Sequence, residues 1–265
     1  MHSYTMERST IIQKLQAIFG QDEAMAMEKI LSEKLKDDPA FDLTNAVDRL
    51  MKQEPLQYIL NEAWFYDQQF YVDNSVLIPR PETEELVHII LQQNPVFEGK
   101  VLDVGTGSGC IAITLKNNLP NANVTAIDKS ENALAVAKKN AVRQHATVNF
   151  LCTDFLKMHD EILPEKYDML VSNPPYIGES EIHSMAQNVA TYEPHLALFV
   201  QDANPLIFYK AIANFAKNNL AKNGKIYVEI NQKFGEETRQ IFTDAGFAAK
   251  LVKDMSGNDR FIFCE

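Results

Sequence analysis

Cysteine is scarce in this chain of 265 residues, which has only Cys110, Cys152 and Cys264. The three include no Cys-x-x-Cys pair, and no histidine-rich spacing surrounds them. An odd count without such spacing argues against both a disulfide framework and a zinc site. We therefore expect no bound metal and a reducing compartment, of which the cytoplasm is the simplest.

The chain also lacks long apolar runs. No segment approaches the roughly 20 consecutive apolar residues that a membrane-spanning helix needs. The first residues, Met1 to Tyr4, do not begin a basic stretch followed by an apolar core, as a secretory signal would. The protein expected from these two absences is cytoplasmic and has no membrane partner.

Basic residues are in the minority: 25 Lys and Arg stand against 36 Asp and Glu, which gives a net charge of −11. Proteins that grip a nucleic-acid backbone usually carry a basic face, because the release of phosphate counterions drives that binding. The charge balance therefore favours proteins and small molecules as partners, and we expect no direct nucleic-acid binding.

Residues 1–60 show helical periodicity and no cluster of residues typical of catalysis. Apolar side chains recur at helical spacing in three segments, which lie at 11–19, 26–35 and 43–51. We predict a small N-terminal helical domain that docks a substrate protein, because a short target loop alone gives little specificity.

Residues 61–80 are rich in aromatic and β-branched side chains. The run Trp64–Val72, with Asp73-Asn74 as a turn signal, predicts a β-hairpin that links two domains.

Residues 81–265 alternate between strand-like and helical patterns. Pro81 fits the first position of a helix, because its fixed φ suits that position and its missing N–H is not needed there. The alternation predicts an α/β fold, a parallel sheet covered by helices on both faces. The strand-like runs lie at 101–104, 124–127, 150–152, 169–171 and 226–230, and the helical patterns at 111–119, 132–142, 205–220 and 236–245.

The end of the chain breaks this alternation. Two strand-like runs, 249–252 and 260–264, are joined by only residues 254–259. No helix fits in so short a connection, so we predict a hairpin that places an antiparallel strand in the sheet.

A glycine-rich turn, Gly105-Thr106-Gly107-Ser108-Gly109, follows the run Val101–Val104. Glycine lets the backbone turn tightly and approach a ligand closely. Ligands of open α/β sheets bind beyond the carboxyl ends of the strands. We therefore predict that this loop binds a cofactor, with Asp103 either holding the loop or facing a cationic part of the ligand.

The spacing of this loop narrows the choice of cofactor without fixing it. A dinucleotide fingerprint would need glycine where the chain has Cys110, and the Gly-Lys-Ser/Thr ending of a P-loop is absent. Asp128, at the end of the second strand, is suited to accept hydrogen bonds from both hydroxyls of a ribose. Such an acid serves NAD and S-adenosylmethionine alike, although the glycine spacing disfavours a nicotinamide dehydrogenase.

The tetrapeptide Asn173-Pro174-Pro175-Tyr176 follows the fourth strand on the same rim of the sheet. The Asn173 side-chain oxygen and the Pro174 carbonyl are placed to accept the two N–H groups of a planar nitrogen. Pro175 stiffens the loop, and Tyr176 offers a flat face for stacking. Such a nitrogen is a poor nucleophile, so its orientation toward an activated methyl group is the main source of rate. These residues predict methylation of a planar nitrogen, with Asn173, Pro174 and Tyr176 catalytic and all four binding the substrate.

On these motifs the sequence resembles the class I methyltransferases, and within them the peptide chain release factor glutamine N5-methyltransferases (the PrmC or HemK family). The resemblance covers nearly the whole chain. Its most specific part is Leu77–Glu84 (LIPRPETE) together with Asn173–Tyr176, and Asp254–Ile262 adds to it. The chain departs from the family at Asn231, where glycine is usual. The family implies a Rossmann-like, seven-stranded, mostly parallel sheet with a C-terminal antiparallel hairpin.

The resemblance also implies the reaction. S-adenosyl-L-methionine would donate a methyl group to N5 of the glutamine in the Gly-Gly-Gln loop of bacterial release factors. Gly105 to Gly109, Asp128 and Asn173 are expected to contact the cofactor. Asp154 would accept a hydrogen bond from its adenine amino group, and Phe155 would lie against the ring.

Two further positions are less defined. Arg80 is a candidate contact for substrate or cofactor, with an ion pair to Glu82 or Glu84 as the alternative. Glu193-Pro194 resembles another family element near the active site, without an assigned role.

Two related functions stay open. A glutamine methyltransferase acting on a ribosomal protein would share nearly all of these motifs. An N6-adenine methyltransferase could use the same Asn-Pro-Pro-Tyr loop on a flipped base, but the net charge of −11 and the LIPRPETE segment weigh against it.

Overall fold

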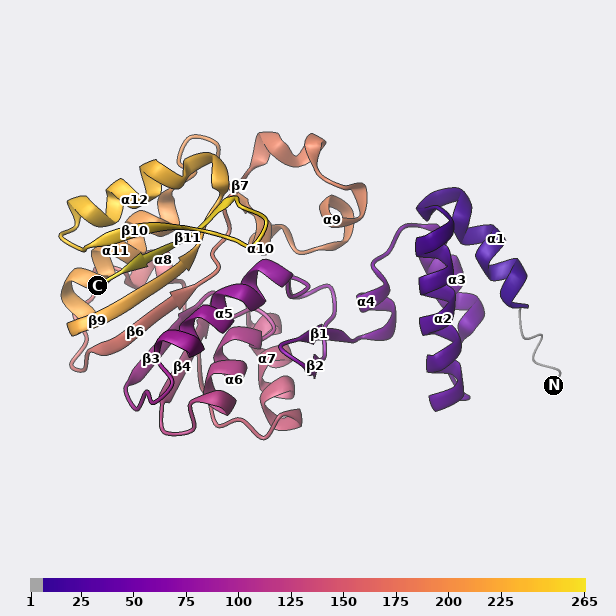
Figure 1. The fold of residues 1–265 in the computed structure, drawn as a ribbon, viewed down its shortest axis with the longest axis horizontal. Helices are drawn as coiled ribbons and strands as arrows, with labels where there is room; N and C mark the ends of the chain where they lie inside the picture. The colour runs from indigo at the N-terminus through magenta and orange to yellow at the C-terminus, as the bar shows by residue number, and fades with distance from the viewer. Residues whose placement is uncertain (1–6) are drawn as a thin grey trace. The chain divides into compact units, whose positions relative to one another are not determined.

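The computed structural model describes residues 7–265. These divide into two compact units, one holding the chain up to Glu62 together with Ala186–Tyr192, the other holding Ala63–Met185 and Glu193–Glu265 (Figure 1). The division differs from the predicted boundaries in two places. The linker was expected over residues 61–80, but residues 63–80 cluster with the larger unit. The short segment 186–192 clusters with the helical one.

The first unit is built from helices around one apolar core. Asp42 begins the third helix, because its carboxylate accepts the backbone N–H of Asn45 at 2.9 Å. The core contains Leu15, Leu31 and Leu50, all fully buried. The helices are α1 (Arg8–Phe19), α2 (Gln21–Asp37), α3 (Leu43–Met51), α4 (Leu56–Leu60) and, from the later segment, α9 (Gln187–Tyr192). Five-residue α4 was not predicted, because it is too short to show helical periodicity.

The second unit contains a seven-stranded sheet in the order β10-β11-β9-β6-β3-β4-β5 (Figure 1). β11 is antiparallel to both of its neighbours, and the other pairs are parallel. The predicted parallel sheet and closing hairpin are therefore confirmed. The strands are β3 (Lys100–Val104), β4 (Asn123–Asp128), β5 (Asn149–Cys152), β6 (Tyr167–Ser172), β9 (Leu220–Glu229), β10 (Ala249–Lys253) and β11 (Asp259–Cys264).

Helices cover both faces of this sheet, as the alternating pattern predicts. Along β3, Val101 belongs to the core under one set of helices and Leu102 to the core under the other. This follows from the two-residue period of a strand. The first set is α5 (Pro81–Gln93), α6 (Cys110–Asn118) and α7 (Glu131–Arg143); the second is α8 (Phe155–Met158), α11 (Ile207–Asn219) and α12 (Gly235–Asp244) (Figure 1).

The strand order reverses between β3 and β6. The chain runs from β3 outward through β4 to β5, then returns to the other side of β3 as β6. The loops after β3 and β6 leave the same edge of the sheet and have no strand between them. Open α/β sheets bind ligands at this switch point, so the topology brings the glycine loop and the Asn-Pro-Pro-Tyr loop together.

The hairpin before the sheet has its turn at an unexpected place. Strands β1 (Ala63–Phe65) and β2 (Gln68–Phe70) are connected by Tyr66 and Asp67, both with positive φ. The predicted turn residues Asp73-Asn74 come after the hairpin, where the Asp73 carboxylate accepts the N–H of Ser75 at 2.9 Å. Aromatic residues rarely adopt positive φ, so the sequence carried no sign of the true turn.

The segment after Tyr176 folds into short helices and strands that the periodicity of the sequence did not predict. They are β7 (Ile177–Gly178), the 3-10 helix η1 (Glu179–Ser184), α10 (His195–Leu198) and β8 (Phe199–Val200). Another 3-10 turn, η2 (Gln232–Phe234), follows β9. Within residues 7–265, no helix is both long and apolar enough to span a membrane.

Candidate active site

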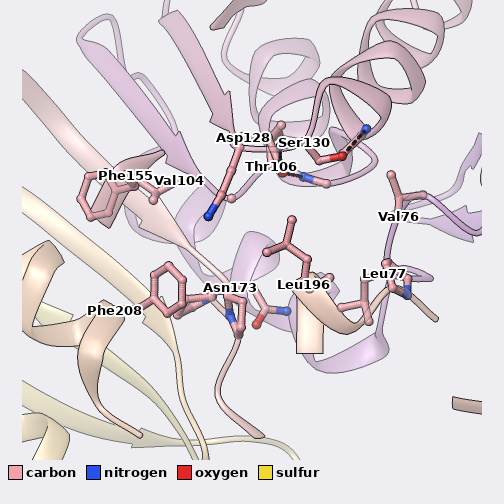
Figure 2. A pocket seen from close by; sticks show the side chains of 18 of the residues that line it. Val76, Leu77, Val104, Thr106, Asp128, Ser130, Phe155, Asn173, Leu196 and Phe208 are labelled. Atoms are coloured by element: carbon pink, nitrogen blue, oxygen red, sulfur yellow. Dashed lines mark hydrogen bonds between the residues drawn. The ribbon is translucent and has the colours of Figure 1, made fainter. Parts of the chain in front are cut away.

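A cavity of about 660 Å³ opens at the carboxyl ends of β3, β4, β5 and β6. Figure 2 shows Thr106, Asp128 and Ser130 along one side of it, with Asn173 and Leu196 along the other. Its polar groups come mainly from the loops after the strands, and apolar side chains, Leu77, Leu196 and Phe208 among them, close it. This mixture of an apolar wall and a few converging polar groups is typical of a small-molecule site.

The glycine loop forms one wall of the cavity. Gly105, Thr106, Gly107 and Ser108 line it, and Gly105 and Gly107 adopt positive φ of 76° and 54°. Gly109 does not line it. A Cβ at Gly109 would lie 2.9 Å from Cδ1 of Ile113 and 3.1 Å from Cβ of Ala137. The third glycine therefore serves the close packing of α6 on α7, and the ligand-contacting role predicted for it is not supported by its position.

Asp103 holds the glycine loop from behind. Its side chain is completely buried, and Thr106 Oγ1 donates a 2.6 Å hydrogen bond to its Oδ2. Burial, helped by the nearby charge of Asp128, raises the pKa of Asp103 to about 7. Of the two roles predicted for Asp103, the structure shows the one of holding the loop, since its carboxylate lies outside the cavity lining.

Asp128 lies at the end of β4 and lines the cavity. Its Oδ2 accepts the N–H of Gly107 and its Oδ1 accepts the N–H of Ser130, each at 2.9 Å. These two bonds fix the carboxylate plane, and each oxygen keeps a lone pair for a ligand. The arrangement suits two adjacent hydroxyl donors.

Asp154 and Phe155 lie at the start of α8, beside Asp128. Asp154 caps the helix by accepting the N–H of Leu156 at 3.2 Å, and its other oxygen lies 3.1 Å from the Lys129 ammonium. Phe155 is buried and meets Phe215 edge to face, with ring centroids 5.3 Å apart. Both residues line the cavity. Packing thus fixes the Phe155 ring at the cavity wall.

The loop after β6 forms the opposite wall. Ser172 Oγ donates to the Val104 carbonyl at 2.7 Å and so joins the ends of β6 and β3. Asn173, Pro174 and Pro175 line the cavity. The Asn173 Nδ2 group donates to Oγ1 of Thr83, which also lines the cavity, at 2.8 Å.

Tyr176 does not line the cavity, contrary to the predicted stacking role. Its ring packs against the apolar core under α11 and α12, and its hydroxyl donates to Oε1 of Glu229 at 3.1 Å. Burial and the Glu229 charge raise the pKa of Tyr176, so the phenol stays protonated and donates. Asn231, the departure from the family, donates its amide to the Tyr176 carbonyl at 3.1 Å and supports the same loop.

Comparison with known proteins decides the family. Residues 82–195 match the family model described as the methyltransferase small domain. A release factor glutamine methyltransferase of Flavobacterium psychrophilum is 42% identical over 96% of this chain and 96% of that protein. One of Bacteroides thetaiotaomicron is 47% identical over 83% of this chain and 79% of its own length. The chain belongs to the release factor glutamine methyltransferase family.

Solved structures agree with this assignment at the level of fold. A methyltransferase from Pyrococcus furiosus superimposes with a TM-score of 0.54 at 17% identity, covering 75% of this chain and 89% of that one. The ribosomal protein L11 methylase from Lactobacillus delbrueckii subsp. bulgaricus gives 0.52 at 19% identity, covering 73% and 83%. At these identities the likeness shows the class I methyltransferase fold alone.

In this methyltransferase, Arg80 is paired inside the protein. It lies outside the cavity lining, and its guanidinium is 2.5 Å from Oε1 of Glu193, not beside Glu82 or Glu84. Oε2 of the buried Glu193 accepts the N–H of Ile78 at 3.2 Å. Glu193 therefore anchors the start of α10 to the LIPRPETE segment, and α10 carries Leu196 to the cavity wall.

Sequence reasoning missed two buried residues of this methyltransferase. Thr83 and Glu229 are 3% and 1% exposed, and Thr83 Oγ1 donates to Oε2 of Glu229 at 2.7 Å. Burial raises the pKa of Glu229 to about 7, while its bonds from Thr83 and Tyr176 and the charge of Arg260 oppose that rise. Thr83 lies within the LIPRPETE motif, which was the only available signal.

Proposed function

We propose that the protein transfers the methyl group of S-adenosyl-L-methionine to N5 of the glutamine in the Gly-Gly-Gln loop of peptide chain release factors, in the cytoplasm. The names of its relatives supply the substrate class. The observation that carries the chemistry is the Asn173 amide at the cavity wall: its nitrogen donates to Thr83, which leaves Oδ1 to accept from a substrate.

The residues of the first wall fit the cofactor. Asp128 is held with both oxygens ready for the ribose hydroxyls, the glycine loop gives close backbone approach, and Phe155 offers an apolar surface for adenine. Asp154, next to Phe155, can still accept a hydrogen bond from the adenine amino group. When bound there, the cofactor supplies a methyl group that its positive sulfonium already activates.

The residues of the second wall would hold the glutamine amide. Asn173 Oδ1 accepts one N–H and the Pro174 carbonyl accepts the other, so the nitrogen is fixed in line with the methyl group. Orientation of this kind is worth up to about 7–11 kcal/mol in well-ordered pairs. Positive charge develops on the nitrogen as the new N–C bond forms, and the two oxygens stabilise it. The nitrogen then loses its proton to water, so no dedicated base is required.

The reaction is tested by incubating the protein with labelled S-adenosylmethionine and purified release factor, ribosomal proteins or DNA. We expect label on the release factor, and none when its Gly-Gly-Gln glutamine is replaced by alanine. Label confined to ribosomal proteins would favour the other glutamine methyltransferase, and label confined to DNA would overturn the proposal.

The cofactor site gives a first mutational prediction. Asp128→Ala should weaken S-adenosylmethionine binding by about 10- to 100-fold, because one or two hydrogen bonds to a charged acceptor are lost. Isothermal titration calorimetry measures this directly. Asp160→Ala is the control, since that side chain is 77% exposed and outside the cavity. Equal affinity of the two variants would exclude Asp128 from the site.

The helical unit is proposed to dock the release factor. Its helix α2 exposes two large apolar side chains, Met25 and Ile30, each about two-fifths accessible. Ile30→Glu should raise the KM for release factor several-fold and leave the KM for S-adenosylmethionine unchanged, because it places a charge in an apolar contact. Gln21→Glu adds the same charge elsewhere on the helix. A normal KM for Ile30→Glu would count against docking at this face.

A further inference from the structure

A chain of hydrogen bonds begins at the Asn-Pro-Pro-Tyr loop and joins three distant segments. Asn173 Nδ2 donates to Thr83 Oγ1 at 2.8 Å, and Thr83 Oγ1 donates to Glu229 Oε2 at 2.7 Å. Thr83 comes from the first turn of α5 and Glu229 from the end of β9. Since Thr83 and Glu229 are almost completely buried, water does not compete for these bonds.

Glu229, at the end of this chain of hydrogen bonds, determines the direction in which each bond is donated. An ionised carboxylate only accepts hydrogen bonds, so Thr83 must use its single hydroxyl proton toward Glu229. The Thr83 oxygen then has only lone pairs to offer Asn173, which must present its N–H. If the Asn173 amide were reversed, its Oδ1 would face Thr83 Oγ1, and neither oxygen would have a proton to donate to the other. Glu229 therefore decides which end of the Asn173 amide is bonded to Thr83 and which end is left for a substrate.

Glu229 holds the far end of the same loop as well. Its other oxygen accepts the Tyr176 hydroxyl at 3.1 Å. One carboxylate thus fixes the first residue of the tetrapeptide through Thr83 and the last residue directly. Arg260, whose Nε lies 3.1 Å from Oδ2 of Asp254, supplies a nearby positive charge that favours the ionised form.

We propose that Glu229 and Thr83 are positioning residues that orient the Asn173 amide, so that the site accepts a group with N–H donors and rejects a carboxylate. The inference rests on the proposed function, since it explains how a glutamine is told from a glutamate. With Nδ2 held by Thr83, Oδ1 is the end of the amide left for a substrate. An amide substrate can donate to this oxygen, whereas a carboxylate has no proton to offer it. In this account Glu229 lies outside the cavity lining, and Thr83, although it lines the cavity, acts through Asn173.

Protonation of Glu229 should remove this preference for one orientation of the Asn173 amide. A protonated carboxyl can donate to Thr83, which frees the Thr83 proton to point at Asn173 and makes the reversed amide acceptable. The ordering is therefore expected to fail as the pH falls through about 7, the pKa to which burial raises Glu229. The titratable or charged groups that face Glu229 are Glu82 from α5, Tyr176, Tyr209 from α11 and Arg260 from β11.

The test compares Thr83→Val, which keeps the shape and loses the hydroxyl, with Thr83→Ser, which keeps the hydroxyl. We expect Thr83→Val to lower kcat at least tenfold with an unchanged Kd for S-adenosylmethionine, and Thr83→Ser to stay within about threefold of the parent. Glu229→Gln should lower kcat and remove the acid limb of its pH profile near pH 7. A normal kcat for Thr83→Val, or equal losses in both threonine variants, would overturn the proposal.

A second readout needs no substrate, so it separates this proposal from the proposed function. In protein labelled with ¹⁵N-asparagine, the Asn173 side-chain NH₂ signals are assigned by their loss in Asn173→Ala. We expect them to titrate with a midpoint near pH 7 and to stop titrating in Glu229→Gln. If the Asn173 signals changed neither with pH nor in Thr83→Val, the hydrogen bonds through Thr83 and Glu229 would not determine the orientation of the Asn173 amide.

Discussion

Replacing Asn173 with alanine is expected to lower kcat for methyl transfer by on the order of 10²–10³-fold, the loss typical when one group that stabilises developing charge is removed. The substitution takes away the acceptor oxygen proposed to bind the substrate, and it removes the N–H that Thr83 Oγ1 accepts. Cofactor affinity should change less than kcat, because Asn173 is one of several expected cofactor contacts and the others, Asp128 and the glycine loop, come from other strands. Single-turnover transfer of labelled methyl measures the rate step itself.

The matched control is Asn121→Ala. Asn121 is exposed, and its side chain donates to Glu98 at 2.9 Å. A normal rate for this variant and a depressed one for Asn173→Ala would assign the loss to the position and not to asparagine content. If Asn173→Ala transferred methyl at the parent rate, the amide would have no part in the chemistry.

Glu229→Gln is expected to make the protein more stable at pH 8, although it should also lower kcat. The folded-state pKa of Glu229 is about 7, against an ordinary value of 4.5 in an unfolded chain, so between these pH values the folded protein binds a proton that the unfolded chain does not. The stability contribution is full below about pH 4.5 and is lost as the pH rises through 7. At pH 8 the buried charge costs on the order of 3 kcal/mol, a cost that glutamine does not carry.

Denaturant unfolding at pH 5 and pH 8 measures this effect. The free energy of unfolding of Glu229→Gln should exceed that of the parent at pH 8 and approach it at pH 5. Glu237→Gln, at an exposed position of α12, should behave like the parent at both values. A residual fall in stability between pH 5 and 8 is expected in every variant, because Asp103 also has a pKa of about 7. A Glu229→Gln protein less stable than the parent at pH 8 would contradict the prediction.

Local patterns were sufficient to predict the sheet and its rims. Short apolar runs alternating with helical ones specify strands buried on both faces, and the residues after β3 and β6 then share an edge by topology. The glycine loop and the Asn-Pro-Pro-Tyr loop were predicted to lie at one edge for this reason, and the structure places residues of both around one cavity.

Contacts that join distant segments were beyond such reasoning. Thr83 and Glu229 are 146 positions apart, and Arg80 and Glu193 are 113 apart. Neither pair leaves a trace in periodicity, because pairing of this kind depends on which loops the finished sheet brings together. Tyr176 shows the same limit. Its flat ring suggested stacking on a substrate, but a buried phenol hydroxyl needs a partner, and Glu229 provides one on the other side of the loop.

Because β3 and β6 are neighbours in the sheet, the residues that suit the methyl donor and those that suit the methyl acceptor come from different strands. The groups that suit the methyl donor follow β3, β4 and β5, whereas those that suit the acceptor follow β6 and are held by α5 and β9. Within the sheet the two halves meet along one strand pair, in which Val104 lies opposite Ser172. A mutation in the acceptor half therefore leaves the donor half in place, so a lineage can explore new acceptors without first losing its source of methyl groups.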